Sequence, residues 1–252
     1  MRLNLERGQI ATSRLGMNGV ELQKRLENIQ LRVLQEKNML IADNPSWDIR
    51  NDVRITTLNN LFISLGRTRL GIQFLGELLD DDWFDKNSPG STQELRIDQV
   101  VSFEKLIKYS FGMDFFTIAE TAFRNFLRAL DPSACNNGTG SFNAIYDCLL
   151  GSRQLNFLSD ERAVAKELLT MSRLLRNLIH NSGTFFSENG QDKTIRYKGK
   201  TYTFKHRKRV SFAYWDLLLK LADDIYQLLV KIISHPNIKS LSHILDPYVT
   251  RN

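Results

Sequence analysis

Four polar residues that lie close together in the sequence have the side chains that phosphate chemistry needs: Arg173, Arg176, Asn177 and His180. Histidine changes its charge near neutral pH, so it can act as a general base or acid. Arginine donates paired hydrogen bonds to phosphate oxygens. These residue types suit RNA cleavage without a metal, in which His180 activates the 2′-hydroxyl or protonates the leaving oxygen and an arginine stabilises the pentacovalent phosphate. Asn177 would orient a ribose hydroxyl or the imidazole.

A helix predicted from about residue 160 to residue 181 positions these four residues. Ser159 is a suitable N-cap, two acidic residues follow in the first turn, and Asn181-Ser182-Gly183 is a typical stop. On a helical wheel the expected core side consists of Val164, Leu168, Met171, Leu175 and Leu178. The opposite side holds Arg162, Lys166, Arg173, Arg176, Asn177 and His180. We expect this side to face solvent, a groove or another chain; an ordinary solvated face is the alternative.

The segment 192–209, which follows closely, is strongly basic, with eight lysines and arginines and one aspartate. Apolar and polar residues alternate on either side of Lys198-Gly199, which predicts a β-hairpin over 194–204. Aromatic side chains among cations can stack on bases while the cations contact phosphates. The candidate nucleic-acid-binding residues are therefore Lys198, Lys200, Tyr202, Lys205, Arg207, Lys208 and Arg209. The alternative is a solvated hairpin whose aromatic side chains pack on the rest of the protein.

Apolar periodicity predicts further helices over 19–42, 52–81, 92–110, 113–130, 142–150 and 211–234. We expect Gly66 or Gly71 to bend the second of these helices and Gly112 to interrupt the helical pattern between 92 and 130. An aromatic stripe that contains Phe116, Phe123 and Phe126 is typical of a core. The predicted fold is an all-α helical bundle with a small β-hairpin.

The polar stretch 80–91, which contains Pro89-Gly90, is the best candidate linker in the chain. It would divide the chain into an N-terminal helical hairpin, residues 1–90, and a helical domain, residues 91–252. The hairpin would serve for dimerisation or for partner binding. The alternative is that its two helices pack onto the rest as part of one bundle.

Composition limits the other possibilities. The chain has 252 residues and a 42% hydrophobic share, as in an ordinary globular protein. Its formal net charge of +6 is compatible with RNA or DNA binding but does not demonstrate it. We expect no signal peptide, no membrane span and a cytoplasmic location.

Cys135 and Cys148 lack metal-ligand or redox spacing, so we interpret them as small buried side chains in a reducing compartment. No phosphate-binding loop, dinucleotide fingerprint or zinc-protease motif occurs, and we expect no cofactor and no metal.

Glu120 and Arg124 are one turn apart and predict an ion pair within a helix. The functional alternative is that Glu120 orients Arg173 or Arg176 from a neighbouring helix.

The string RNLIHNSG at 176–183 resembles the Arg-Asn…His motif of the HEPN superfamily, the higher eukaryotes and prokaryotes nucleotide-binding domains. It is similar to a group of bacterial proteins in which RNxIHNxG precedes a hairpin like KGKTYTF at 198–204. The resemblance covers roughly residues 110–235. It implies an α-helical dimer that joins two motifs, and ribonuclease activity in phage defence or toxin–antitoxin systems. His180 would then be the catalytic base or acid, Arg176 or Arg173 would bind the scissile phosphate, and Asn177 would be the neighbouring polar residue.

Three functions remain open at this point. The first is a HEPN-like RNA-binding protein that acts as a metal-independent endoribonuclease, with RNA and a cognate protein or antitoxin as partners. The second is a non-catalytic nucleic-acid or nucleotide-binding module. The third is an interaction scaffold whose N-terminal helices recruit a partner.

Overall fold

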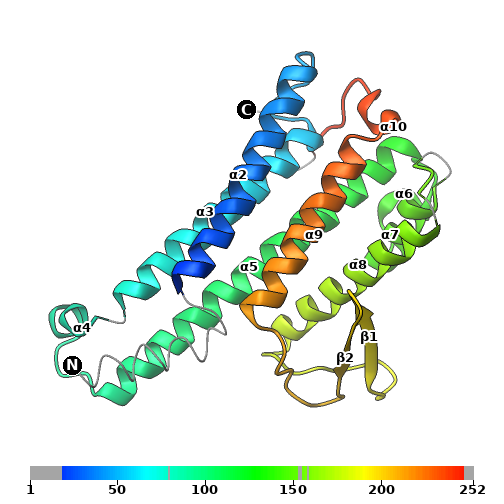
Figure 1. Cartoon of the computed structure of the whole chain (residues 1–252). Coiled ribbons are helices and arrows are strands. Elements are labelled where there is room, and N and C mark those ends of the chain that lie inside the picture. Colours follow the sequence, from blue (N-terminus) through cyan, green and yellow to red (C-terminus); the bar gives the residue numbers. More distant parts are fainter. Residues whose placement is uncertain (1–18, 79, 153–154, 158, 247–252) are drawn as a thin grey trace.

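Helices form almost all of the secondary structure in this computed structural model, which describes residues 19–78, 80–152, 155–157 and 159–246. The helices are α2 (Gly19–Asp43), α3 (Val53–Glu77), α4 (Asp81–Asn87), α5 (Gln93–Leu130), α6 (Cys135–Gly138), α7 (Phe142–Gly151), α8 (Ser159–His180), α9 (Trp215–Ile233) and α10 (Pro236–Lys239). The antiparallel strands β1 (Lys193–Tyr197) and β2 (Lys200–Phe204) form a small sheet (Figure 1). The predicted all-α bundle with a β-hairpin is confirmed.

The two N-terminal helices pack on the rest of the bundle. α2 buries Leu22, Leu26, Ile29 and Val33, the stripe that periodicity predicted. α3 lies between α2 and α5, and α2 also contacts α9 (Figure 1). Apolar residues from α2 and α3 therefore belong to the same core cluster as those of α5, α8 and α9. Whether residues 1–90 also fold by themselves stays a prediction.

Glycines allow the long helices to approach one another without interrupting them. α3 continues through Gly66 and Gly71, and α5 continues for 38 residues through Gly112. A Cβ atom on Gly71 would lie 3.1 Å from Ile107 of α5, and one on Gly112 would lie 3.3 Å from Ile179 of α8. The expected interruption at Gly112 is wrong because packing partners on both sides stabilise a continuous α5.

The stretch expected to be an irregular linker contains a short helix, α4. Asp80 caps it by accepting a hydrogen bond from the Asp82 amide at 3.0 Å. Phe84 is only 2% exposed, and Trp83 packs edge to face with Phe74 of α3 at 5.8 Å. The sequence-based expectation missed α4 because its two aromatic residues are surrounded by polar ones.

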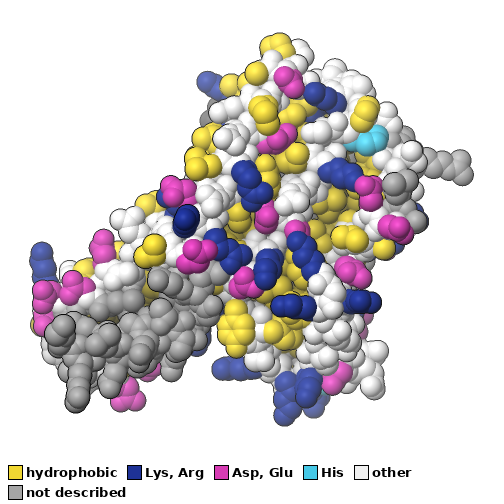
Figure 2. Space-filling view, in the orientation of Figure 1, with side chains coloured by type: hydrophobic (Ala, Val, Ile, Leu, Met, Phe, Trp, Pro, Cys, Tyr) yellow, Lys and Arg dark blue, Asp and Glu magenta, His cyan; other side chains and the backbone are white. Residues whose placement is uncertain are grey.

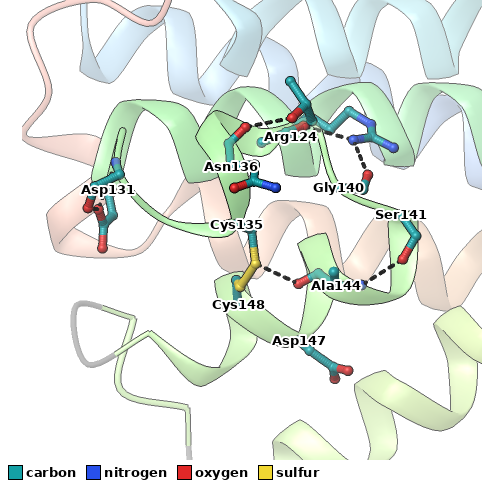
Figure 3. Close-up of a disulfide and its surroundings, with 12 residues drawn as sticks. Arg124, Asp131, Cys135, Asn136, Gly140, Ser141, Ala144, Asp147 and Cys148 are labelled. Atoms are coloured by element: carbon teal, nitrogen blue, oxygen red, sulfur yellow. Dashed lines mark hydrogen bonds between the residues drawn. A yellow bond between two sulfur atoms is a disulfide. The ribbon is translucent and has the colours of Figure 1, made fainter.

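Cys135 and Cys148 are joined by a disulfide that links α6 to α7 (Figure 3). Both residues are half-buried, so the interpretation as unpaired buried side chains is wrong. Cys135 and the two asparagines after it have positive φ angles, which turn the chain back toward α7. Arg124 of α5 holds this turn by donating to the carbonyls of Gly138 at 2.8 Å and Gly140 at 2.9 Å.

α9 closes the bundle. It begins at Trp215, four residues later than predicted, and the fully buried indole donates to Glu104 of α5 at 2.9 Å. α9 contacts α2, α5 and α8, so it joins the N-terminal helices to the helix that carries the polar stripe (Figure 1). In the described part of the chain no helix has both the length and the apolar character that a membrane span requires.

Candidate functional site

α8 carries the four residues that motif and spacing single out. It ends at His180, and Gly183, with φ +84°, donates back to the carbonyl of Leu178 at 2.7 Å, as the predicted stop requires. The core side is as predicted at Leu168, Met171, Leu175 and Leu178, whereas Val164 is 62% exposed and does not belong to it. Other buried residues widen the buried arc of α8: Ala165, Leu169, Ser172 and Leu174. The polar stripe is correspondingly narrower than the wheel suggested.

Arg176 lies at the edge of the core and does not point straight away from it. Its guanidinium carbon is 5.2 Å from the centre of the Phe116 ring on α5. Its Nη1 donates to the side-chain oxygen of Asn177 at 3.3 Å, while its Nε is buried without a hydrogen-bond partner. The side chain also lines an apolar cavity of about 30 Å³ between α5, α8 and α9, which is large enough to hold a water molecule. Arg176 is thus a charge held against aromatic and apolar neighbours.

Arg173 lies beside the β-hairpin. Its Nε is buried and has no hydrogen-bond partner. β1 packs against α8, and this packing brings Lys193 toward Arg173. Burial and the positive charge of Arg173 lower the pKa of Lys193, and Glu188 opposes this shift. The tertiary structure therefore collects like charges at this point.

Within the described residues neither Arg173 nor Arg176 makes an ion pair with a carboxylate. A partly buried cation without a counter-charge is electrostatically costly. An anion such as a phosphate would offset that cost and fill the open hydrogen-bonding positions.

His180 and Asn177 are less constrained than the arginines. His180 is exposed at the last position of α8, and its ring has no hydrogen bond to any described residue. Asn177 is half-buried; its side chain accepts from Arg176, and its carbonyl accepts from Asn181 at 3.0 Å. No bond joins Asn177 to the imidazole, so Asn177 does not orient the His180 ring in the single chain.

Glu120 pairs with Arg124, as the i,i+4 spacing predicted. Arg124 Nε donates to Glu120 Oε1 at 3.1 Å, and the same guanidinium holds the turn before α7. This pair stabilises α5 and the turn. No described contact joins Glu120 to the arginines of α8.

The hairpin lies at the predicted position, and its strands pair with Ile195 opposite Tyr202. Lys198 and Gly199 have φ angles of 48° and 74°, which suit the tight turn of a two-residue hairpin. Tyr197 and Phe204 are buried, and Tyr202 is half-buried with its ring 5.1 Å from that of Phe212. Tyr197 and Phe204 therefore pack on the bundle, and Tyr202 presents only part of its ring.

The cations of the basic segment divide into two groups. Lys198 is paired with Asp224 of α9 at 2.7 Å. Apart from the half-buried Lys193, the others are exposed and make no ion pair with any described residue: Arg196, Lys200, Lys205, Arg207, Lys208 and Arg209. Figure 2 shows Lys and Arg side chains gathered over the segment that joins β2 to α9.

Two features of the site come only from the tertiary structure. Lys193 belongs to the basic segment, but its proximity to Arg173 depends on how β1 packs against α8. Phe186, which sequence reasoning did not single out, is 55% exposed beside the same basic segment. No local pattern marks either contact, because each joins residues from different elements.

Comparison with known proteins adds no relative: the chain matches no family model, no curated protein and no solved structure.

Proposed function

We propose that the protein binds RNA at the α8–hairpin surface and cleaves it without a metal, with His180 as general base or acid. The observation that carries this proposal is the group of uncompensated cations: Arg173 and Arg176 each have a buried, unpartnered Nε, and Lys193 lies near Arg173. Exposed cations of the basic segment extend this surface along a path that RNA phosphates could follow.

The chemistry follows from residue types and position. Arg176 and Arg173 would hold the scissile phosphate and stabilise the charge that develops on it. His180, one turn beyond Arg176, would take the proton of the 2′-hydroxyl or give one to the leaving oxygen. This is the role that the HEPN resemblance implies for these positions. The proposal includes a homodimer, a cytoplasmic location and a cognate protein or antitoxin in a bacterial defence or toxin system.

Binding without cleavage is the second candidate function. It is favoured by one observation: no described side chain orients the His180 ring. A general base or acid is normally fixed by a hydrogen bond to its second ring nitrogen. In the binding module His180 would contribute little, and the arginines would contribute most of the affinity.

The test uses labelled RNA and the full-length protein in EDTA, with cleavage read on a denaturing gel and binding on a native gel. We expect the wild type to cleave and His180→Ala to bind without cleaving. His243→Ala is the matched control, because His243 also reaches solvent but contacts Asp52 at the start of α3. If every variant binds RNA and none cleaves it, the non-catalytic binding module is the remaining function. If no variant binds or cleaves RNA, the interaction scaffold is the remaining function.

A further inference from the structure

The loop that follows α8 returns alongside the basic segment. The Phe185 amide donates to the carbonyl of Lys208 at 3.1 Å, and the Arg207 amide donates to the carbonyl of Phe185 at 2.7 Å. A bridge between Thr184 and Arg209 continues this pairing. Phe186 is therefore held beside residues 205–209 by backbone hydrogen bonds.

Phe185 and Phe186 point in different directions. Phe185 is 4% exposed and packs on Phe204 of β2, whereas Phe186 is 55% exposed. Alternation along an extended segment explains the difference, because successive side chains leave opposite faces. The Phe186 ring consequently presents apolar surface to solvent within a charged region.

The Phe186 ring packs against the ring of His206. The two rings meet edge to face with centroids 6.1 Å apart. His206 is itself fixed, since its Nδ1 accepts from the Ser187 amide at 3.2 Å and its own amide donates to Asp192 at 2.8 Å. An aromatic ring that is held in place loses little conformational entropy when a ligand covers it.

Exposed cations lie next to His206 in the sequence. Lys205, Arg207 and Lys208 are exposed and make no ion pair with any residue that the structure describes. The charge of Glu188, two residues after Phe186, acts on Lys193, which in turn lies near Arg173. The segment that carries the aromatic pair therefore runs close enough to Lys193 for the charge of Glu188 to act on it. Aromatic faces among phosphate-binding cations are how proteins hold single-stranded nucleic acid.

We propose that Phe186, supported by His206, forms a base-stacking subsite for one unpaired base, while Arg207 and Lys208 contact the adjacent phosphates. This inference rests on the proposed function and narrows its substrate to an unpaired strand, because a duplex hides the faces of its bases. Phe186 is a binding residue here and takes no part in bond cleavage.

The test measures affinity by fluorescence anisotropy with full-length protein and three labelled probes. The probes are a 2′-O-methyl oligouridine, which lacks the reactive 2′-hydroxyl, an abasic strand of the same length, and a duplex. We expect the oligouridine to bind more tightly than the abasic strand. Phe186→Leu should weaken oligouridine binding by roughly 5- to 150-fold, the value of one stacked base, and should leave abasic binding unchanged.

Two further variants separate stacking from folding defects. Phe186→Tyr retains the ring and should restore the affinity. Phe74→Leu makes the same change at another exposed phenylalanine, on α3, and should alter no affinity. If Phe186→Leu and the wild type bind the oligouridine with equal affinity, the stacking subsite is contradicted. The proposed function would still hold in that case if binding depends on Arg173. Absence of binding to all three probes would overturn both.

Discussion

Arg173 and Lys193 carry like charges on α8 and β1, two elements that pack against each other. Neither residue has an ion-pair partner within the described chain, so no ion pair offsets their repulsion. Like charges brought together reduce stability, and the opposing charge of Glu188 does not cancel the lowering of the Lys193 pKa, so a bound anion should stabilise the pair. At the scale of single residues, this unfavourable arrangement is the strongest sign of a ligand.

The substitution Arg173→Gln should therefore weaken RNA binding without lowering stability. Loss of a charge-assisted hydrogen bond of about 1.5–3 kcal/mol predicts an affinity loss of about tenfold or more. The pKa of Lys193 should rise toward its ordinary value, because the repulsion disappears. Affinity measured against salt concentration should show a slope reduced by about one.

A control for this prediction is Lys24→Gln, which removes one exposed charge from α2. It changes the net charge equally but lies on a helix that does not carry the site. If both variants lost the same affinity, net charge alone would explain binding and the Arg173 site would be contradicted.

At the scale of elements, α9 anchors the hairpin through one carboxylate. The Tyr197 hydroxyl and the Lys198 ammonium both donate to Asp224. Burial and the hydrogen bond to Asp224 raise the pKa of Tyr197 above its ordinary value of 10.0. The bond therefore stabilises the fold at neutral pH, where the phenol is protonated in both the folded and the unfolded chain.

Tyr197→Phe should lower the free energy of unfolding by about 1.5–3 kcal/mol, as expected for a hydrogen bond to a charged acceptor. Above pH 10.0 the unfolded tyrosine ionises while the folded one stays protonated, so the wild type should lose stability as pH rises through this value. The variant should lack this part of the alkaline loss. Urea unfolding below and above pH 10 measures both effects, with Tyr214→Phe, at an exposed tyrosine, as control.

The disulfide between α6 and α7 gives a second prediction at this scale. It spans a sequence separation of 13 residues, and closing a loop of this length should stabilise the protein by about 3 kcal/mol. Dithiothreitol should therefore lower the urea midpoint of the wild type. The double variant Cys135→Ser/Cys148→Ser should not respond to the reductant. If two thiols can be titrated in the unfolded protein before any reductant is added, the disulfide is contradicted.

At the scale of the whole molecule, a buried ion pair ties the C-terminal segment to the start of α3. Arg54 and Asp52 are both fully buried, with Arg54 Nε 2.8 Å from Asp52 Oδ1. Arg54 also donates to the carbonyls of Ile238 at 2.9 Å and Leu241 at 2.8 Å, and its guanidinium carbon lies 3.6 Å from the centre of the Trp47 ring. This network joins segments that are almost two hundred residues apart in the chain.

Arg54→Met should therefore cost about 3–5 kcal/mol, because it leaves the Asp52 carboxylate buried without its partner. The double variant Asp52→Asn/Arg54→Met should cost less than the sum of the two single variants. Urea unfolding of all four proteins measures this coupling. Additive losses would show that the pair is not coupled.

Local patterns predicted most of the secondary structure. The hydrophobic spacing in α2 and α8 and the alternation around Lys198-Gly199 depend only on near neighbours, so the bounds of these elements were close to those observed. The same reasoning failed at Gly112 and at α4. There, contacts with distant side chains outweigh the local preference of a glycine or of a polar stretch.

Sequence patterns alone predict a helical bundle with a hairpin and place Arg173, Arg176, Asn177 and His180 on one helix. The packing of the elements brings Arg176 over Phe116, Lys193 near Arg173 and Cys135 to Cys148. Periodicity places side chains on a face of their own element. Which neighbour covers that face, and which charge remains unpaired, depends on how the elements pack.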